Sequence, residues 1–180
     1  APAVYERAWK FLCYGDFVTL RLGLEPIIDR TMAARTLAYD VRSDCWSDEI
    51  LDAAGIEASR FAHVLPSGTV IGEIPAQIAR SLGFVEPVQV AAGGHDQPCA
   101  ALGAGVIEPG AVMYSIGTTE AIVAVLTGAR PELRTGNFAV YPHVVPLTYV
   151  ALAGNQTGGR LLRWYRDVLG TQEVEVARRE

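Results

Sequence analysis

Residues 88–97 read Val-Gln-Val-Ala-Ala-Gly-Gly-His-Asp-Gln, an apolar run that ends in two glycines and three polar side chains. The run predicts a buried β-strand, and residues 97–104 predict a short helix of small residues after it. Ligands of open α/β sheets bind outside the carboxyl ends of strands, which is where Asp96 would lie. The two glycines would let a ligand approach the backbone closely. The stretch therefore predicts an α/β fold with a ligand site in this loop.

Asp96 has two interpretations on spacing alone. Its carboxylate can accept the proton of an attacking hydroxyl, which typically contributes about 10²–10⁴-fold in rate. An aspartate shortly before Pro98 at the head of a helix is also typical of an N-cap, which is worth ~1 kcal/mol. Spacing favours the cap, and the two roles are compatible if the side chain leaves the cap.

The residues before this loop predict helices and one strand. Apolar residues recur at helical spacing over residues 3–22, with a break near Gly15. Helices are also expected over residues 47–55, which begin with a serine N-cap and end in glycine, and over residues 75–83, which begin with proline. A strand is expected over residues 69–74.

The residues after the loop predict a different arrangement. Glu108-Pro109-Gly110 marks a domain boundary. Beyond it the pattern is at most four strands followed by one helix, with expected ranges of 112–116, 121–126, 137–144, 148–153 and 154–170.

A second loop that could carry chemistry joins the first two of these strands. It reads Gly117-Thr118-Thr119-Glu120. A glycine turn whose backbone amides point at one spot, with threonine hydroxyls beside them, can bind phosphate without lysine. Lys10 is the only lysine and no GxxxxGK[ST] motif occurs, so a P-loop is excluded. An ordinary hairpin turn has the same residues, and this loop alone favours that simpler interpretation.

Composition narrows the class of protein. The 180 residues carry a net charge of −5, which argues against nucleic acid or an anionic membrane as the main partner. No apolar run approaches the roughly 18 residues that a membrane span needs. Charges among the first residues argue against a signal peptide, so a cytoplasmic location is expected. The chain opens without methionine, which suggests a piece of a longer polypeptide.

The cysteines and histidines predict no metal or thiol chemistry. Cys13, Cys45 and Cys99 are widely spaced and are expected to be buried free thiols. A metal hydrolase that uses His95 and Asp96 is a further alternative. His95, His143 and Asp96 have ligating side chains, but their spacing fits no metal motif, so no metal ligand is assigned.

Five sequence blocks occur in the order in which one enzyme family has them. They are residues 20–40, 46–51, 66–72, 92–105 (with Gly-Gly-His-Asp-Gln and Ala-Leu-Gly-Ala-Gly) and 109–120 (with Pro-Gly and Ser-Ile-Gly-Thr-Thr-Glu). This collinear set resembles the FGGY carbohydrate kinases, which include xylulokinase, fuculokinase and glycerol kinase, and it spans nearly the whole chain.

The resemblance implies part of a two-lobed, actin-like (ribonuclease H-like) α/β fold. Residues 1–107 would be the C-terminal part of the first, sugar-binding lobe, and residues 108–180 the N-terminal part of the second, ATP-binding lobe. It implies transfer of the ATP γ-phosphoryl group, with Mg²⁺, to a hydroxyl of a ketose or polyol. In that reaction Asp96 would be the general base.

The resemblance also implies roles for the neighbouring residues. Gln97 would contact the sugar, and His95, which stands where some members have glycine, resembles the deoxy-sugar branch and is a further candidate sugar contact. The Gly117, Thr118 and Thr119 turn would hold the ATP phosphates. A homodimer is expected, since relatives often form dimers.

The resemblance also shows departures. The family's opening hairpin, with its magnesium aspartate, and its late adenine-binding segment have no counterpart in this sequence. We therefore expect the chain alone not to turn over ATP. A non-catalytic relative that binds a sugar or nucleotide is the alternative.

Overall fold

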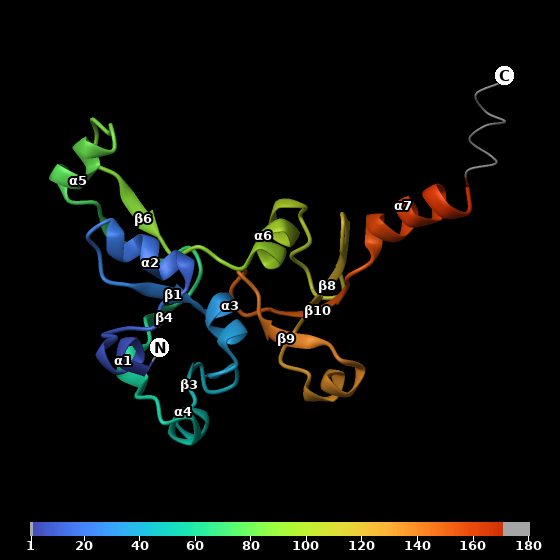
Figure 1. Cartoon of the computed structure of the whole chain (residues 1–180), viewed down its shortest axis with the longest axis horizontal. Coiled ribbons are helices and arrows are strands. Elements are labelled where there is room, and N and C mark those ends of the chain that lie inside the picture. Colours follow the sequence, from blue (N-terminus) through green and yellow to red (C-terminus); the bar gives the residue numbers. More distant parts are fainter. Residues whose placement is uncertain (1, 171–180) are drawn as a thin grey trace.

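The computed structural model describes residues 2–170. Two groups of elements stand side by side in Figure 1, one built from the chain up to β6 and one built around β7–β10. Helix α6 follows the connection between them, and α7 extends away from the rest of the molecule (Figure 1). None of the helices in the described range is long and apolar enough to cross a bilayer.

The first group contains short strands paired two by two, with helices packed around them. β1 pairs with β4 in parallel, β2 pairs with β3 antiparallel, and β5 pairs with β6 antiparallel. The elements are α1 (Pro2–Arg7), α2 (Tyr14–Arg21), β1 (Ile27–Asp29), α3 (Arg30–Ala33), η1 (Ala34–Thr36), β2 (Tyr39–Asp40), β3 (Cys45–Trp46), α4 (Asp48–Ala54), η2 (Ala58–Arg60), β4 (His63–Leu65), β5 (Val70–Glu73), α5 (Ala76–Ser81), β6 (Gln89–Ala91) and α6 (Asp96–Gly103).

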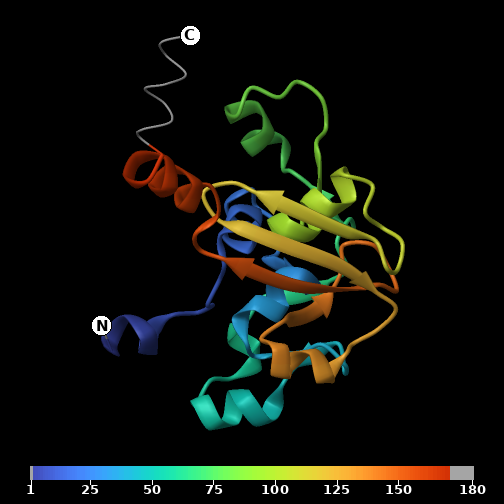
Figure 2. The same cartoon turned by 90° about the vertical axis from the view of Figure 1, so that its right-hand side faces the viewer.

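The second group is an antiparallel sheet in the order β7-β8-β10-β9, which Figure 2 shows with its long strands side by side. β8 and β10 pair along seven residues, from Glu120–Asn155 to Leu126–Tyr149. The elements are β7 (Val112–Ile116), β8 (Glu120–Leu126), η3 (Pro131–Gly136), β9 (Ala139–Pro142), β10 (Tyr149–Asn155) and α7 (Gly158–Val168).

The two groups meet through a shared apolar cluster. Its buried members are Ala101 of α6 and Val123, Tyr141 and Val150 of the sheet. Ala34 and Val41 of the first group pack against the same cluster. The Tyr149 hydroxyl adds a hydrogen bond of 3.2 Å to the Val41 carbonyl. The start of α6, where the Gly-Gly-His-Asp loop ends, therefore lies at the junction of the two groups.

Most of the predicted elements are confirmed. α4 begins after Ser47, whose hydroxyl accepts the Ile50 amide, and it ends at Gly55 in the left-handed conformation that glycine adopts readily. The four strands and the helix after residue 110 are all present. The range 3–22 differs from the prediction, because residues 8–13 are not helical and Gly15 lies inside α2. Lys10 explains the break, since its ammonium donates to the carbonyls of Ser59 and Phe61.

Two predictions of burial are wrong. β6 was expected to be buried, but its residues alternate between exposed and partly buried, because among residues 2–170 it has β5 as its one strand partner (Figure 1). Cys45 and Cys99 are exposed and Cys13 is partly buried, although all three are free thiols as expected. For Cys99 the reason is that α6 packs through only one of its faces, which buries Pro98 and Ala101.

Candidate active site

Asp96 is the first residue of α6, and its carboxylate points into open space. The side chain is 81% exposed. The N-cap of α6 is His95, whose side chain makes no capping hydrogen bond, so Asp96 is not the N-cap that its spacing favoured. The helix begins one residue earlier than that interpretation requires. The carboxylate is therefore free of a capping role and accessible to a ligand.

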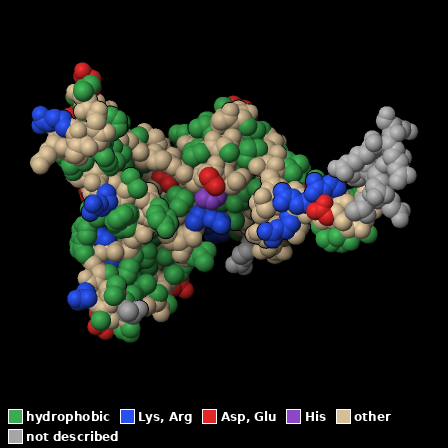
Figure 3. Space-filling view, turned by 45° about the horizontal axis from the view of Figure 1, so that its top comes forward, with side chains coloured by type: hydrophobic (Ala, Val, Ile, Leu, Met, Phe, Trp, Pro, Cys, Tyr) green, Lys and Arg blue, Asp and Glu red, His purple; other side chains and the backbone are tan. Residues whose placement is uncertain are grey.

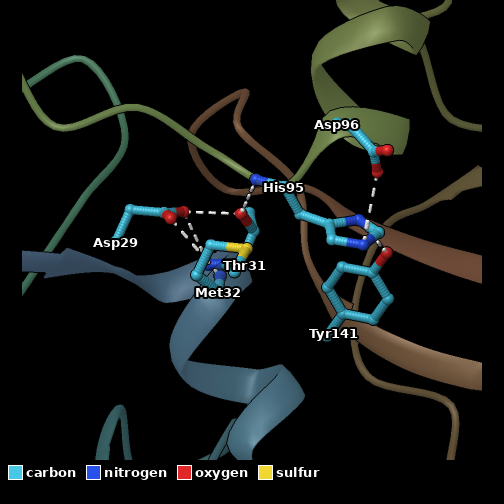
Figure 4. Close-up of polar contacts among 6 residues, drawn as sticks. All are labelled: Asp29, Thr31, Met32, His95, Asp96 and Tyr141. Carbon is cyan, nitrogen blue, oxygen red and sulfur yellow. Dashed lines mark hydrogen bonds and ion pairs between the residues drawn. The ribbon is translucent and has the colours of Figure 1, made fainter. Parts of the chain in front are cut away.

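His95 lies beside Asp96 and is held from two sides. Its Nε2 is 3.4 Å from Asp96 Oδ1, and its Nδ1 is 3.2 Å from the Tyr141 hydroxyl of β9 (Figure 4). The His95 side chain is 18% exposed. Burial lowers the pKa of His95, because an imidazolium loses hydration there, and Arg35 acts in the same direction while Asp96 and Asp29 oppose it. His95 thus lies between the two groups of elements.

The backbone of the loop is anchored by a buried polar network. The His95 amide donates to Thr31 Oγ1 at 2.6 Å, and Thr31 Oγ1 donates to Asp29 Oδ2 at 2.6 Å (Figure 4). Asp29 caps α3 through the amides of Thr31 and Met32 and also accepts from the Ser67 hydroxyl. Asp29 and Thr31 are both buried. One carboxylate at the end of β1 therefore fixes the loop that carries His95 and Asp96.

Sequence reasoning missed this network. Asp29 lies in the first of the five blocks that carry the family resemblance, but no role was assigned to it there. A signal was available, because an aspartate that follows two apolar residues, with a threonine two positions later, is typical of an N-cap at a helix start. What the pattern could not show is that Thr31 reaches the loop 64 positions later.

Gly94 shows why the loop needs a glycine. A β-carbon there would lie 2.5 Å from Val144 Cγ1 and 2.9 Å from Cys99 Sγ. The loop thus packs directly against the segment that joins β9 to β10. Next to it, Gln97 Oε1 is buried and has no hydrogen-bond partner among the described residues. A buried acceptor without a donor costs about 1–3 kcal/mol, so a ligand hydroxyl that reached Gln97 would relieve this cost.

The second candidate loop is an exposed hairpin turn between β7 and β8. Thr118 and Thr119 are exposed. The Gly117 amide donates to the Thr119 carbonyl at 2.8 Å, so it is not free for a ligand in this conformation. Among residues 2–170, the backbone hydrogen bonds outside helices and strands give the Thr118 and Thr119 amides no acceptor. Two amides and two hydroxyls therefore remain as donors.

The start of α7 packs on this turn. The Gly159 amide donates to the Gly117 carbonyl at 2.7 Å, and a β-carbon at Gly159 would lie 2.7 Å from the same oxygen. Figure 2 shows α7 starting at the end of the sheet where the β7–β8 turn lies. A helix amino terminus carries a partial positive charge, so this end of the sheet favours an anion.

The two loops are separate in the structure. Within the described residues, no hydrogen bond or ion pair joins the turn at 117–119 to His95, Asp96 or Gln97. Figure 3 shows a histidine side chain, with an acidic and a basic side chain next to it, in the hollow between the two groups of elements. A cavity of about 500 Å³, lined by α2, β1 and β6, reaches the loop at Gly93 and Gly94. In residues 2–170 no three side chains of the ligating types gather as a metal site.

Comparison with known proteins gives a family. The family model described as "FGGY family of carbohydrate kinases, N-terminal domain" matches residues 1–103. An autoinducer-2 kinase of Enterobacter sp. (strain 638) is 31% identical, and the match covers 99% of this chain and 33% of that protein. A xylulose kinase of Lactococcus lactis is 29% identical over 94% of this chain and 33% of its own length. The chain thus spans about a third of the curated relatives that it matches.

Solved structures show the same fold. A xylulose kinase from Brucella ovis superposes with a TM-score of 0.84 at 26% identity, covering 94% of this chain and 35% of that one. Plasmodium falciparum glycerol kinase with ADP superposes with a TM-score of 0.68 at 17% identity, covering 84% of this chain and 30% of that one. These likenesses confirm the prediction of an α/β fold that is part of the two-lobed, actin-like fold. The family model matches more than half of the 180 residues of this chain, so the chain belongs to the FGGY family of carbohydrate kinases.

Proposed function

We propose that this chain is part of an ATP-dependent kinase that phosphorylates a hydroxyl of a ketose or polyol, with Asp96 as the general base. The observation that carries the proposal is the Asp96 carboxylate, which is 81% exposed at the head of α6 and has His95 beside it. In the reaction Asp96 accepts the proton of the sugar hydroxyl as its oxygen attacks the γ-phosphorus of ATP. His95 and Gln97 flank the base and contact the sugar.

The turn at 117–119 holds the ATP phosphates in this proposal. The amides and hydroxyls of Thr118 and Thr119 are the donors. Gly117 shapes the turn, and its carbonyl accepts a hydrogen bond from the Gly159 amide. ATP enters as its Mg²⁺ complex, since Mg²⁺ is commonly held by substrate phosphates, water and one or two carboxylates. The donors of the turn fit phosphate, whereas residues 2–170 form no cluster of ligating side chains to which Mg²⁺ could be assigned.

The division into lobes follows from the same proposal. Residues 1–107 belong to the sugar-binding lobe and residues 108–180 to the ATP-binding lobe, with the last ten residues outside the described range. Closure of the lobes would bring the turn to Asp96 and exclude water, which competes with the sugar as acceptor. The chain by itself does not turn over ATP in this account. A cytoplasmic location and a homodimer stay predictions.

The substitution Asp96→Asn in the full-length protein tests the role of the base. We expect kcat to fall by about 10²–10⁴-fold, because an amide cannot accept the proton, while ATP binding measured by calorimetry is retained. Asp48→Asn is the matched control, since Asp48 is also the first residue of an exposed helix start, and it should leave kcat unchanged.

Two results would contradict the proposal. Turnover near that of the parent in Asp96→Asn would remove Asp96 as the base. Sugar binding without any ATP consumption by the parent protein, across a panel of ketoses and polyols, would favour a non-catalytic binding protein instead.

A further inference from the structure

We infer that Tyr141 is a positioning residue for Asp96: its hydroxyl sets the tautomer of His95, and this tautomer places the Nε2–H of His95 near the Asp96 carboxylate. This inference rests on the proposed function, because it explains how the base is oriented. It assigns a task to a residue far from Asp96 in sequence, which lies on strand β9, whereas Asp96 begins helix α6.

The position of Tyr141 is rigid. Its ring belongs to the apolar cluster of the sheet and is 2% exposed. The rings of Tyr141 and His95 meet edge to face, with centroids 5.9 Å apart and an angle of 85° between the planes. The hydroxyl lies 3.2 Å from His95 Nδ1 (Figure 4). A buried phenol requires a hydrogen-bond partner, and here that partner is the His95 ring.

The protonation states decide which atom donates. Burial raises the pKa of Tyr141 to about 12, so the phenol keeps its proton at neutral pH. Burial also lowers the pKa of His95, with Arg35 acting in the same direction and Asp96 and Asp29 opposing, which favours the neutral ring. A neutral imidazole has one N–H and one acceptor nitrogen, so two tautomers are to be compared.

Only one tautomer satisfies both contacts of the His95 ring. With the hydrogen on Nε2, the phenol donates to Nδ1, and the positive end of the Nε2–H dipole lies near Asp96 Oδ1, which is 3.4 Å from Nε2. With the hydrogen on Nδ1, the lone pair of Nε2 would face a carboxylate oxygen, and this contact is repulsive. Among the described residues the buried Tyr141 hydroxyl has no other hydrogen-bond partner, so its proton needs the lone pair of Nδ1. The Tyr141 hydroxyl therefore favours the Nε2–H form, and that form attracts the carboxylate of Asp96.

The consequence is a link between the two groups of elements. Asp96 and His95 follow the first group, whereas Tyr141 lies on β9 of the sheet that also carries the 117–119 turn. The base is thus oriented by a hydroxyl from the part of the molecule that is proposed to bind ATP. A shift of that part relative to α6 would change the tautomer of His95 and the position of the Asp96 carboxylate together.

The test is Tyr141→Phe in the full-length protein, since this change removes one oxygen and keeps the ring. Selective ¹⁵N labelling of histidine, assigned with His95→Gln, reports the tautomer directly. We expect the parent to show the Nε2–H form and Tyr141→Phe to show a mixture. We also expect kcat to fall about 3- to 10-fold, the effect of one hydrogen bond, with an unchanged KM for ATP.

Tyr149→Phe is the matched control. It removes a hydroxyl that also joins the two groups, through its bond to the Val41 carbonyl, but that has no contact with His95 among the described residues. It should leave the tautomer and kcat as in the parent.

The outcomes separate the two proposals. A parent with the hydrogen on Nδ1, or a Tyr141→Phe protein with the parental tautomer and kcat, would overturn the inference while leaving Asp96 as the base. An active Asp96→Asn protein would overturn the function, and the tautomer would still report whether Tyr141 controls His95. If Tyr141→Phe does not fold, the tautomer of His95 in the parent tests the inference alone: the Nε2–H form supports it, and the Nδ1–H form overturns it.

Discussion

Gly159→Ala should separate α7 from the turn that is proposed to hold ATP. In an ordinary helix, replacing glycine by alanine stabilises by about 0.8–1 kcal/mol. Here a β-carbon would lie 2.7 Å from the Gly117 carbonyl oxygen, and real β-carbons essentially never come within 3.0 Å of a heavy atom outside their own and the adjacent residues. That oxygen belongs to the backbone, so it cannot rotate away. The helix or the turn must move.

The magnitude follows from the competing effects. Overpacking costs about 1–3 kcal/mol. Separation of the two segments also weakens the hydrogen bond from the Gly159 amide to Gly117, which is worth about 0.5–1.5 kcal/mol. These losses exceed the gain in helix propensity, so we expect a net loss of about 1–2 kcal/mol. If the turn moves with the helix, a hydrogen bond from the turn to a charged phosphate oxygen is weakened, and a loss of about 1.4 kcal/mol there lowers the affinity for ATP about tenfold.

The assay is calorimetric titration of the full-length protein with ATP, together with a thermal melt. Gly15→Ala is the matched control, because Gly15 is also the second residue of a helix and a β-carbon there meets nothing within 4 Å. It should raise stability by about 0.5–1 kcal/mol and leave ATP affinity unchanged. If Gly159→Ala bound ATP as the parent does and were stabilised like Gly15→Ala, the packing of α7 on the turn would have no role in binding.

Two further predictions concern the loop and its surroundings. Thr31→Val keeps the shape of the side chain but leaves the His95 amide without its acceptor, so it should cost about 1–3 kcal/mol of stability and lower kcat. Thr19→Val in α2 is the control and should have smaller effects on stability and kcat. Equal denaturation midpoints and equal kcat values for the two variants would contradict this prediction. His143 is neutral in the fold, where Nδ1 accepts the Val144 amide and burial lowers its pKa although the contact with the Val106 carbonyl opposes this. Because the unfolded chain binds more protons below its ordinary pKa of about 6.5, the free energy of unfolding should fall as pH drops from 7 towards 5, by at most about 1.4 kcal/mol per pH unit for this residue. Urea denaturation at several pH values should show that the free energy of unfolding depends less steeply on pH in His143→Asn than in the parent. An unchanged dependence on pH would refute the neutral state assigned to His143.

Local sequence signals predicted the helix ends well. Ser47 and Gly55 bound α4 because a serine hydroxyl and a glycine at positive φ satisfy the helix ends without help from the rest of the fold. The break expected near Gly15 lies earlier in the structure, because α2 already begins at Tyr14. Asp16 Oδ2 accepts the Cys13 amide at 2.9 Å, and this contact from the third helical residue back to the N-cap fixes the helix start at Cys13.

The site could be predicted only in part. The Gly-Gly-His-Asp loop and the Gly-Thr-Thr turn stand out because glycine and polar residues follow apolar strands. Asp29 and Tyr141 do not stand out in that way. Asp29 acts through Thr31 on a residue much later in the chain, and Tyr141 occupies a core position of β9 where an aromatic residue looks like packing. Their roles depend on contacts between distant segments, which spacing along the chain does not show.

The structure removes one of the two interpretations of Asp96, the N-cap, and leaves the catalytic base as a proposal. The same spacing fits a capping residue and a catalytic base. The helix α6 begins one residue earlier than the capping interpretation requires, so His95 and not Asp96 is the N-cap. With His95 as the N-cap, the carboxylate is left facing solvent beside a neutral imidazole. The central claim is therefore chemical, namely that this carboxylate removes the proton of the attacking hydroxyl.

A rapid-quench measurement of γ-phosphoryl transfer tests that claim most directly. The full-length Asp96→Asn protein would be loaded with ATP and the preferred sugar and followed through one turnover beside the parent. The account predicts transfer slower by about 10²-fold or more with ATP still bound. A transfer rate equal to that of the parent would contradict it.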